Sequence, residues 1–291
     1  LLPSVFPHIQ AMGDSLSFHQ PELGLVCVTA SDKVRFRSLT RKRLLQLDAV
    51  EQEQALRRLY AENLSRLDLA IDFCQQMQIK LYRLSSALFP FADTPAGADI
   101  LLEFAREMQT IGNRARSYGI RLVLHPDQFV VLNSDRPDVI KNSIKILTCH
   151  AQIFDLLSLP HSPWALMNIH GGKGERAERL IQTIRDLPDA IRLRLTLEND
   201  EYTYGAIAIA EICQAAAIPM VFDAHHHAIH AQLSSYEDPS VAEMLALAQS
   251  TWQVPEWQLV HISNGNSSFL DPQHSDYINL MPSSFRRVPW I

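Results

Sequence analysis

The chain has 291 residues, of which 47% are hydrophobic and 20% are charged. This length and apolar content suffice for a buried core in one large domain or two small ones. The formal net charge is −6 and the pI is near 6.1, which argues against holding nucleic acid by bulk positive charge. No apolar run reaches the about 18 residues of a membrane span, and the first residues lack the features of a secretory leader. We therefore expect a cytoplasmic protein with no membrane association.

Cysteine and histidine usage narrows the chemistry. The cysteines are Cys27, Cys74, Cys149 and Cys213. They lie in apolar segments without CxxC spacing, so we expect buried thiols rather than disulfides or a thiolate zinc site. Twelve histidines are the unusual feature of the composition, and their positions decide whether they indicate a functional site.

Short β-type runs alternate with longer helical patterns, which indicates parallel βα units. The expected strands occupy residues 23–29, 79–84, 120–125, 164–170, 192–198, 218–223 and 258–262, and residues 287–291 could open an eighth. Apolar residues recur at helical spacing in residues 45–78, 97–118, 137–157, 175–187 and 204–217. In the first of these helices, one predicted face is formed by Leu64, Leu67, Ala70, Ile71 and Cys74.

The number and order of these elements predict the fold class. They are typical of an α/β protein with a TIM-type (β/α)8 barrel, here with an eighth strand that is incomplete at the C-terminus. The alternative is an open doubly wound sheet, but no glycine-rich phosphate turn follows an early strand. We assign residues 1–21 to an N-terminal extension and residues 22–291 to a catalytic barrel domain.

Metal-type residues end five successive expected strands, and the carboxyl ends of barrel strands carry the active site. The strand-terminal residues are His125, His170, Glu198, Asp223 and His261. A single histidine there is as often a satisfied hydrogen-bonding residue as a ligand. We put the chance that all five arise by accident below about one in ten. His274, in DPQHSDYI, is a further candidate on the same rim.

This donor set predicts a cluster of divalent ions. Imidazole and carboxylate without thiolate suit Zn²⁺ or Mn²⁺, and these donors alone do not separate the two ions, of which we expect Mn²⁺ first. About four donors suffice for one ion and this rim offers about eight, so we expect two or three ions with Glu198 or Asp223 bridging. Multinuclear sites of this kind favour displacement at phosphorus, because the ions activate water and neutralise the phosphate. Phosphoester hydrolysis is therefore the leading chemistry.

The motifs that carry these residues resemble those of the ultraviolet damage endonuclease family, UvdE or UvsE. The resemblance spans nearly the whole chain, and its most specific motifs are HPDQF, LENDE and DAHHH. In family order, the other matching segments are LGLVCVT, YRLSSALFPFADTP, NIHGGKGER, VHISNG and QHSDYI. The resemblance implies a monomeric endonuclease that acts in the repair of damaged double-stranded DNA. Incision is implied immediately 5′ of cyclobutane dimers and 6–4 photoproducts.

The resemblance also implies the metal ligands. One ion falls to His125, His170 and Glu198, a second to Asp223 and His261 beside it, and a third to His226 and His274. Among these, catalytic roles are implied for Glu198, Asp223 and His261. Strand alternation alone would point His225 the same way as Asp223, but the family pattern selects His226, which we follow.

A wedge that enters the duplex at the lesion is implied for the residues after the first histidine ligand, here Gln128 and Phe129. An aromatic ring can fill the stack that an extruded dinucleotide vacates, while an amide caps the orphaned bases. The alternative is that Phe129 belongs to the core, because FVVL is apolar, and we give that roughly one chance in three.

Two departures from the family pattern stand out. The family has a lysine two positions before the seventh-strand histidine, and Leu259 stands there in this chain. The family's last glutamate ligand ends the eighth strand, whereas this sequence stops at RRVPWI. We expect the natural chain to continue beyond Ile291. The second ion would then regain its carboxylate.

Basic residues on the same rim are candidates for phosphate contacts. Lys173 and Arg176 follow the fourth expected strand, and Arg41 and Arg43 lie in VRFRSLTRKR, the most basic stretch of the chain. A solvated loop is an equally good interpretation of that stretch. Its place after the first strand favours DNA.

Two other function classes compete with the nuclease. A metal-dependent sugar isomerase or epimerase uses the same barrel and ligands but offers no reason for HPDQF, and we give it about one chance in ten. A catalytically impaired protein that binds lesions without cutting is suggested by Leu259 and the missing glutamate.

Overall fold

The computed structural model describes residues 20–26, 35–126 and 129–291. The strands among these residues form one parallel sheet. Its strands are β1 (Gly24–Val26), β2 (Leu81–Leu84), β3 (Arg121–Leu124), β4 (Met167–His170), β5 (Leu195–Glu198), β6 (Met220–Asp223) and β7 (Val260–His261). They lie side by side in chain order, as expected when each strand is followed by a helix that returns the chain. The predicted α/β barrel class is confirmed.

The C-terminal residues close this sheet on itself. Trp290 forms parallel bridges both to Glu22, beside β1, and to Leu259, beside β7. The Gly24 amide donates to the Ile291 carbonyl at 2.7 Å. A β-carbon on Gly24 would lie 3.1 Å from that carbonyl oxygen, so glycine lets the two segments approach. The eighth position of the barrel therefore has the two isolated bridges of Trp290 rather than a full strand, which agrees with the predicted incomplete barrel.

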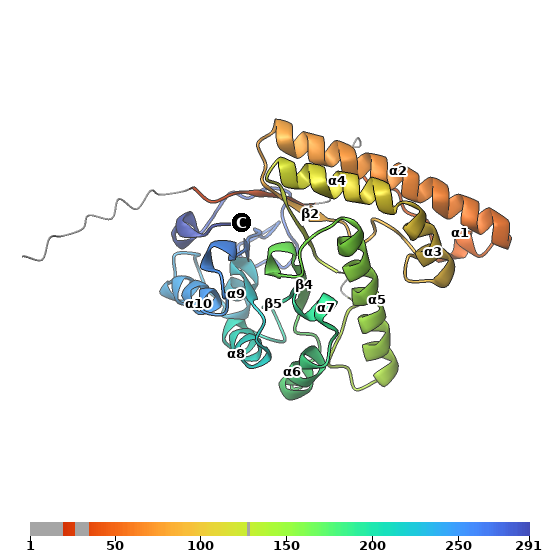
Figure 1. Cartoon of the computed structure of the whole chain (residues 1–291). Helices are drawn as coiled ribbons and strands as arrows, with labels where there is room; N and C mark the ends of the chain where they lie inside the picture. The colour runs from red at the N-terminus through yellow and green to blue at the C-terminus, as the bar shows by residue number, and fades with distance from the viewer. Residues whose placement is uncertain (1–19, 27–34, 127–128) are drawn as a thin grey trace, which may run out of the picture.

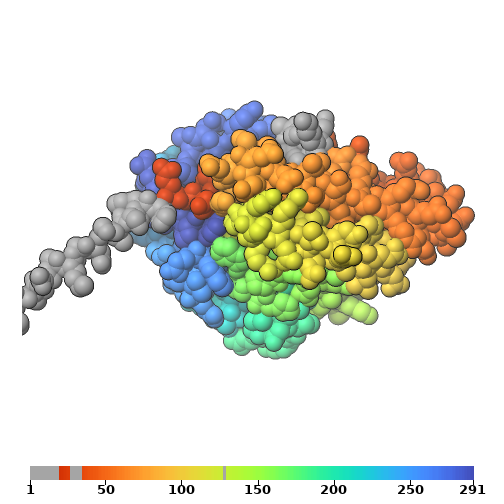
Figure 2. Space-filling model, turned by 45° about the horizontal axis from the view of Figure 1, so that its top comes forward, coloured from red at the N-terminus to blue at the C-terminus, as the bar shows by residue number. Residues whose placement is uncertain are grey.

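The helices surround the sheet (Figure 1). They are α1 (Arg41–Leu44), α2 (Ala49–Gln76), α3 (Pro95–Glu103), α4 (Ala105–Ser117), α5 (Pro137–Leu156), α6 (Ala177–Arg185), α7 (Asp189–Arg192), α8 (Ala206–Ala216), α9 (Ala224–His230) and α10 (Pro239–Gln249). Helix α2 starts with a capping box between Asp48 and Glu51. All five residues of its predicted face are buried. Helices α2, α3 and α4 cover one side of the barrel (Figure 2).

Several predicted boundaries were wrong. The helix expected over residues 97–118 is two helices that meet at Phe104. The strands expected from residues 164 and 192 begin only at Met167 and Leu195, because a 3-10 turn (Pro163–Ala165) and α7 precede them. Apolar stretches this short do not distinguish a strand from a helical turn. Helices α9 and α10 were not predicted.

The inside of the barrel holds an apolar layer and one buried cation. Apolar side chains from the strands and from the segments next to them form a separate cluster. Its buried members are Leu81, Val123, Leu166, Val221, Trp252 and Leu259. At the amino-terminal mouth, the fully buried Arg121 donates to the carbonyls of Pro163, Trp164 and Trp257 at 2.8–3.0 Å. Leu259, which replaces the family lysine, thus belongs to a packed apolar floor.

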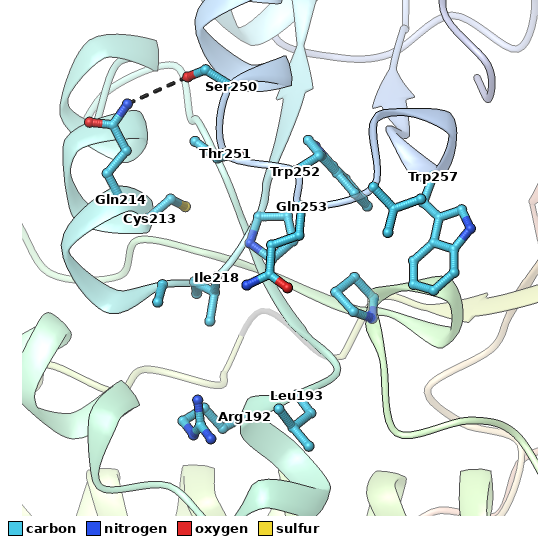
Figure 3. A pocket seen from close by; sticks show the side chains of 14 residues that line it. Arg192, Leu193, Cys213, Gln214, Ile218, Ser250, Thr251, Trp252, Gln253 and Trp257 are labelled. Carbon is cyan, nitrogen blue, oxygen red and sulfur yellow. Dashed lines mark hydrogen bonds between the residues drawn. The ribbon is translucent and has the colours of Figure 1, made fainter.

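A cavity of about 310 Å³ lies near the amino-terminal end of β6, between α8 and the segment after α10 (Figure 3). Trp252 and Trp257 line it together with Arg192 and Cys213. None of the described residues around it is a histidine or a carboxylate, and Cys213 is the one thiol among them. Cys74 and Cys213 are buried free thiols, as predicted, whereas Cys149 is a free thiol that is only partly buried, and Cys27 lies outside the described residues. Within the described ranges, no helix is both long and apolar enough to cross a membrane.

Candidate metal centre

The carboxyl ends of β3 to β7 bring the strand-terminal side chains together. Strand register pairs His170 with Glu198 and Asp223 with His261 across neighbouring strands. Residues that pair directly across parallel strands lie at one level and share a face. The ligand-type side chains therefore meet on the inner side of the rim, above the apolar floor.

Glu198 lies at the centre of this arrangement and is only 2% exposed. His261 Nδ1 lies 3.0 Å from Glu198 Oε1, and His125 Nε2 lies 3.3 Å from Oε2. The Asn168 amide also donates to Oε2, while Thr196 donates to Asn168 at 2.8 Å and orients it. A carboxylate so enclosed is held in one orientation by side chains on three other strands.

The surroundings keep Glu198 ionised. Burial by itself would raise the pKa of this carboxyl. The charge of His261 and the hydrogen bonds from His125 and His261 outweigh burial, so the pKa lies well below its usual range. A buried negative charge with both oxygens directed at imidazole nitrogens is suited to binding cations.

Three groups of side chains each place one donor atom per residue within 4.8 Å of the others. The groups are His125, His170 and Glu198; Glu198, Asp223 and His261; and Glu201, His226 and His274. Because Glu198 belongs to two of them, one carboxylate lies between two candidate cation positions. The first two groups match the sets implied by the family resemblance.

The histidines of the first group offer free nitrogens to a cation. The ring Nδ1 of His125 bonds to the Pro126 carbonyl at 2.9 Å, which leaves Nε2 toward Glu198. Among the described residues, the buried Nδ1 of His170 has no hydrogen-bond partner. Burial lowers the pKa of His170, so its ring is neutral, and neutral imidazole is the form that binds metals. The donors present therefore fit a divalent ion.

The three adjacent histidines lie in a helix rather than a strand, so strand alternation does not apply to them. Asp223 caps α9 by accepting from the amides of His225 and His226 at 2.7 and 2.9 Å. Both ring nitrogens of His225 already have hydrogen-bond partners: Nδ1 lies 2.8 Å from the Tyr236 hydroxyl and Nε2 lies 3.0 Å from a backbone carbonyl. His227 bonds instead to a serine hydroxyl on α10 at 3.1 Å. Only His226 of the three falls in a candidate group.

Glu201 is the member of these groups that sequence reasoning missed. It lies three residues after Glu198 in LENDE, directly beyond the end of β5. Its place on the rim loop was a usable signal, since loops after barrel strands carry site residues. Burial alone would lower the pKa of His226, but three carboxylates, Asp223 first and Glu201 among them, raise it to about 9. The negative charge of these carboxylates therefore favours the binding of a cation beside His226.

Two of the four basic candidates converge on one carboxylate. Lys173 and Arg176, together with Arg179, all pair with Asp135 on the same rim. Hydrogen bonds from Arg176 and then Lys173 hold the pKa of Asp135 far below its usual range. These three cations and Asp135 form one charged patch on the rim, with the exposed Glu175 and Glu178 beside it. Arg179 was not predicted.

Of the remaining DNA-contact candidates, the three that the structure describes are exposed. Arg41 and Arg43 are exposed on α1, which Figure 1 shows at the end of the molecule far from the C-terminus. Phe129 is 72% exposed, so the alternative that it belongs to the core was wrong. Gln128 lies outside the described residues, as does most of the N-terminal extension assigned to residues 1–21. That assignment stays a prediction.

Comparison with known proteins shows what the chain resembles as a whole. Residues 21–291 match the family model described as UV-endonuclease UvdE. The chain is 55% identical over 274 residues to a UV DNA damage endonuclease of Nostoc sp., covering 94% of this chain and 85% of that protein. It is 47% identical over 274 residues to one of Deinococcus radiodurans, covering 93% of this chain and 90% of that protein.

Solved structures agree on the architecture. The crystal structure of SacUVDE matches with a TM-score of 0.76 at 25% identity, covering 90% of this chain and 86% of that chain. A 3-keto-D-glucoside 4-epimerase from E. coli matches with a TM-score of 0.50 at 8% identity, covering 84% and 80%. The epimerase shares the fold alone.

Proposed function

This chain belongs to the UV-endonuclease UvdE family, and from that premise we propose that its rim hydrolyses the phosphodiester 5′ of cyclobutane dimers and 6–4 photoproducts with bound divalent ions. It is a UV DNA damage endonuclease by family and by the names of its relatives. The metal dependence, the hydrolytic chemistry and the incision position are our proposal. So are a monomeric enzyme and a cytoplasmic setting.

One observation carries the metal part of this proposal. Glu198 is buried, ionised and shared between two groups of donors, one with His125 and His170 and one with Asp223 and His261. The printed partners of Glu198 are imidazoles and the Asn168 amide, and a buried carboxylate without a compensating cation is costly. We propose two or three ions at this rim, with Mn²⁺ first and Zn²⁺ second on the nitrogen and oxygen donors.

The proposed hydrolysis depends on the ions and the carboxylates that the rim side chains would hold in position. When bound, divalent ions would activate water and offset the charge that builds up on the attacked phosphate. Glu198, Asp223 and His261 are the proposed catalytic group. The side chains of Asn168 and Thr196 keep Glu198 fixed, and the cap contact of Asp223 with α9 leaves its second oxygen available. The apolar floor below excludes water from the underside of the site.

DNA is proposed to approach along the same rim. Phe129, exposed next to β3, would enter the stack at the lesion together with Gln128. Lys173 and Arg176, as part of the patch on Asp135, would contact backbone phosphates. The net charge of −6 then matters less, because positive charge is concentrated where the phosphates lie.

A nicking assay tests the proposed function. Irradiated and plain duplexes are incubated with the enzyme and Mn²⁺ or EDTA, and strand breaks are mapped on a sequencing gel. We expect a nick immediately 5′ of the photoproduct only with irradiated DNA and metal. Cleavage of plain duplex at equal rate, or cleavage that survives EDTA, would refute the proposal. In a binding arm, Phe129→Ala should lose most of the preference for irradiated DNA, and an unchanged preference would remove Phe129 from the wedge.

The two other function classes are a sugar epimerase and a lesion-binding protein without nuclease activity. The sugar epimerase alternative is not favoured, because the epimerase shares the fold at 8% identity whereas the endonucleases share up to 55%. A lesion-binding protein without activity would bind irradiated duplex in the same assay but leave it intact.

Charge reversal at α1 tests the proposed phosphate contacts. We expect Arg41→Glu with Arg43→Glu to weaken binding to duplex of any sequence by about tenfold or more at moderate salt. The slope of log affinity against log salt should flatten by about two, since each phosphate contact contributes about one. The matched control is Arg58→Glu with Arg106→Glu, exposed cations on α2 and α4. Equal losses in both double variants would mean a general charge effect instead of a contact.

A further inference from the structure

We propose that Glu201 is a protein ligand of the cation held with His226 and His274, and that this site is separate from the pair of groups that share Glu198. The inference rests on the proposed metal dependence of the rim. It adds a carboxylate to a position for which the sequence supplied only two histidines. The three donor atoms lie within 4.8 Å of one another, and the group contains no member of the other two.

The loop after β5 is built to hold Glu201 over the rim. Asp200 accepts hydrogen bonds from the amides of Tyr202, at 2.8 Å, and of Tyr204, at 3.2 Å. The Asp200 amide in turn donates to the Tyr204 carbonyl at 3.0 Å. These bonds close the loop into a compact turn, as aspartate side chains commonly do. Glu201 lies within this turn with its side chain only 17% exposed.

His226 presents the correct nitrogen to Glu201. Its Nδ1 donates to the backbone carbonyl of Asn199 at 2.9 Å, so Nε2 is the nitrogen that faces the Glu201 carboxylate. A histidine that ligates a metal commonly donates its other ring N–H to a backbone carbonyl in this way. Asn199 is itself fixed, because its amide bonds to the Asp223 backbone in both directions at 2.9 Å.

The separation of the two donors fits a shared ion better than a direct bond. His226 Nε2 and Glu201 Oε1 are 3.4 Å apart. A charge-assisted hydrogen bond between such groups is about 2.7–2.9 Å long. Two donors each about 2.1 Å from one tetrahedral ion lie roughly 3.4 Å from each other. The observed spacing therefore leaves room for a cation between them.

His274 completes the group from a different part of the chain. An antiparallel bridge between Gly265 and His274 holds it, and the Ser275 amide donates to the Asn264 carbonyl at 2.7 Å. The ring of His274 lies 5.8 Å from the ring of His226. Because His274 is exposed while Glu198 is buried, this site is open to solvent. We expect it to hold its ion more weakly than the sites on Glu198 and to leave a coordination position free for a phosphate oxygen.

Metal titration of Glu201→Gln tests the inference without relying on activity. Mn²⁺ is titrated into the metal-free full chain, and bound ions are counted by isothermal calorimetry and by the electron paramagnetic resonance of free Mn²⁺. We expect the weakest class of sites to lose about 100-fold or more in affinity, so that about one ion per chain disappears at moderate free Mn²⁺. Glu201→Asp keeps the charge on a side chain shorter by one methylene. Its Mn²⁺ affinity at this site should lie between those of Glu201→Gln and the wild type.

The matched control is Glu175→Gln, an exposed glutamate on the neighbouring rim loop that belongs to none of the groups. It should bind Mn²⁺ like the wild type. Unchanged stoichiometry and affinity in Glu201→Gln would overturn the inference and mean that Glu201 only pairs with His226. The same loss in Glu175→Gln would also overturn it. If the wild type binds ions but does not nick irradiated DNA, the proposed function fails while this inference stands.

Discussion

Glu198→Gln is expected to reduce nicking of irradiated duplex by at least about a thousandfold while leaving lesion binding within a few-fold of the wild type. Glutamine has nearly the same shape, but it lacks the negative charge that two candidate cation sites share. Its amide would also oppose the donor of Asn168, which now bonds to the carboxylate. A thousandfold loss corresponds to about 4 kcal/mol in the activation barrier, within what lost metal-ion catalysis can explain.

Lesion binding should persist because other side chains provide the proposed contacts to DNA. Phe129 and the cations on Asp135 lie outside the Glu198 groups. Single-turnover nicking and equilibrium binding to the same irradiated duplex measure the two effects separately. Glu178→Gln, an exposed glutamate in the first turn of α6, is the control and should cut normally. Nicking by Glu198→Gln at the wild-type rate would remove Glu198 from the catalytic group.

Arg121→Ala is expected to lower the free energy of unfolding by about 3–5 kcal/mol, the largest stability effect we foresee. The guanidinium is fully buried and bonds to three backbone carbonyls at the amino-terminal mouth of the barrel. It also packs against the ring of Trp164 at 4.9 Å and that of Trp290 at 5.3 Å. Removing it leaves three partly buried carbonyls without this donor and opens a cavity between the two rings.

Urea denaturation followed by circular dichroism measures this loss, with an unchanged m value as the sign of intact two-state folding. Arg121→Met separates the two causes. It fills most of the volume but satisfies no carbonyl, so a smaller loss of about 1–3 kcal/mol is expected. Arg106→Ala, on the exposed face of α4, should change stability by less than about 0.5 kcal/mol. An Arg121→Ala protein as stable as that control would mean that the mouth reorganises around water.

The sequence by itself determined the barrel and most of its rim. Alternating strand and helix patterns are local, so they could be followed along the chain without knowledge of contacts. The apolar strands that end in His125, His170 and Glu198 revealed the rim for the same reason, since parallel strands bring their carboxyl ends to one edge. The role of Phe129 as an exposed residue could not be decided this way, because an apolar neighbourhood is equally typical of a core.

Only the tertiary structure decided features that depend on distant partners. Asp223 caps a helix, and this cap, not strand alternation, directs His226 away from His225. Trp290 closes the barrel by pairing with residues about 270 and 30 positions away, which no local pattern encodes. Glu201 lies near His226 and His274 because the loop after β5, helix α9 and the segment after β7 meet on one rim. Likewise, Asp135 pairs with Lys173 and Arg176 of the loop after β4 and with Arg179 of α6. Local periodicity specifies which way each strand and helix faces, whereas long-range packing alone specifies which side chains meet.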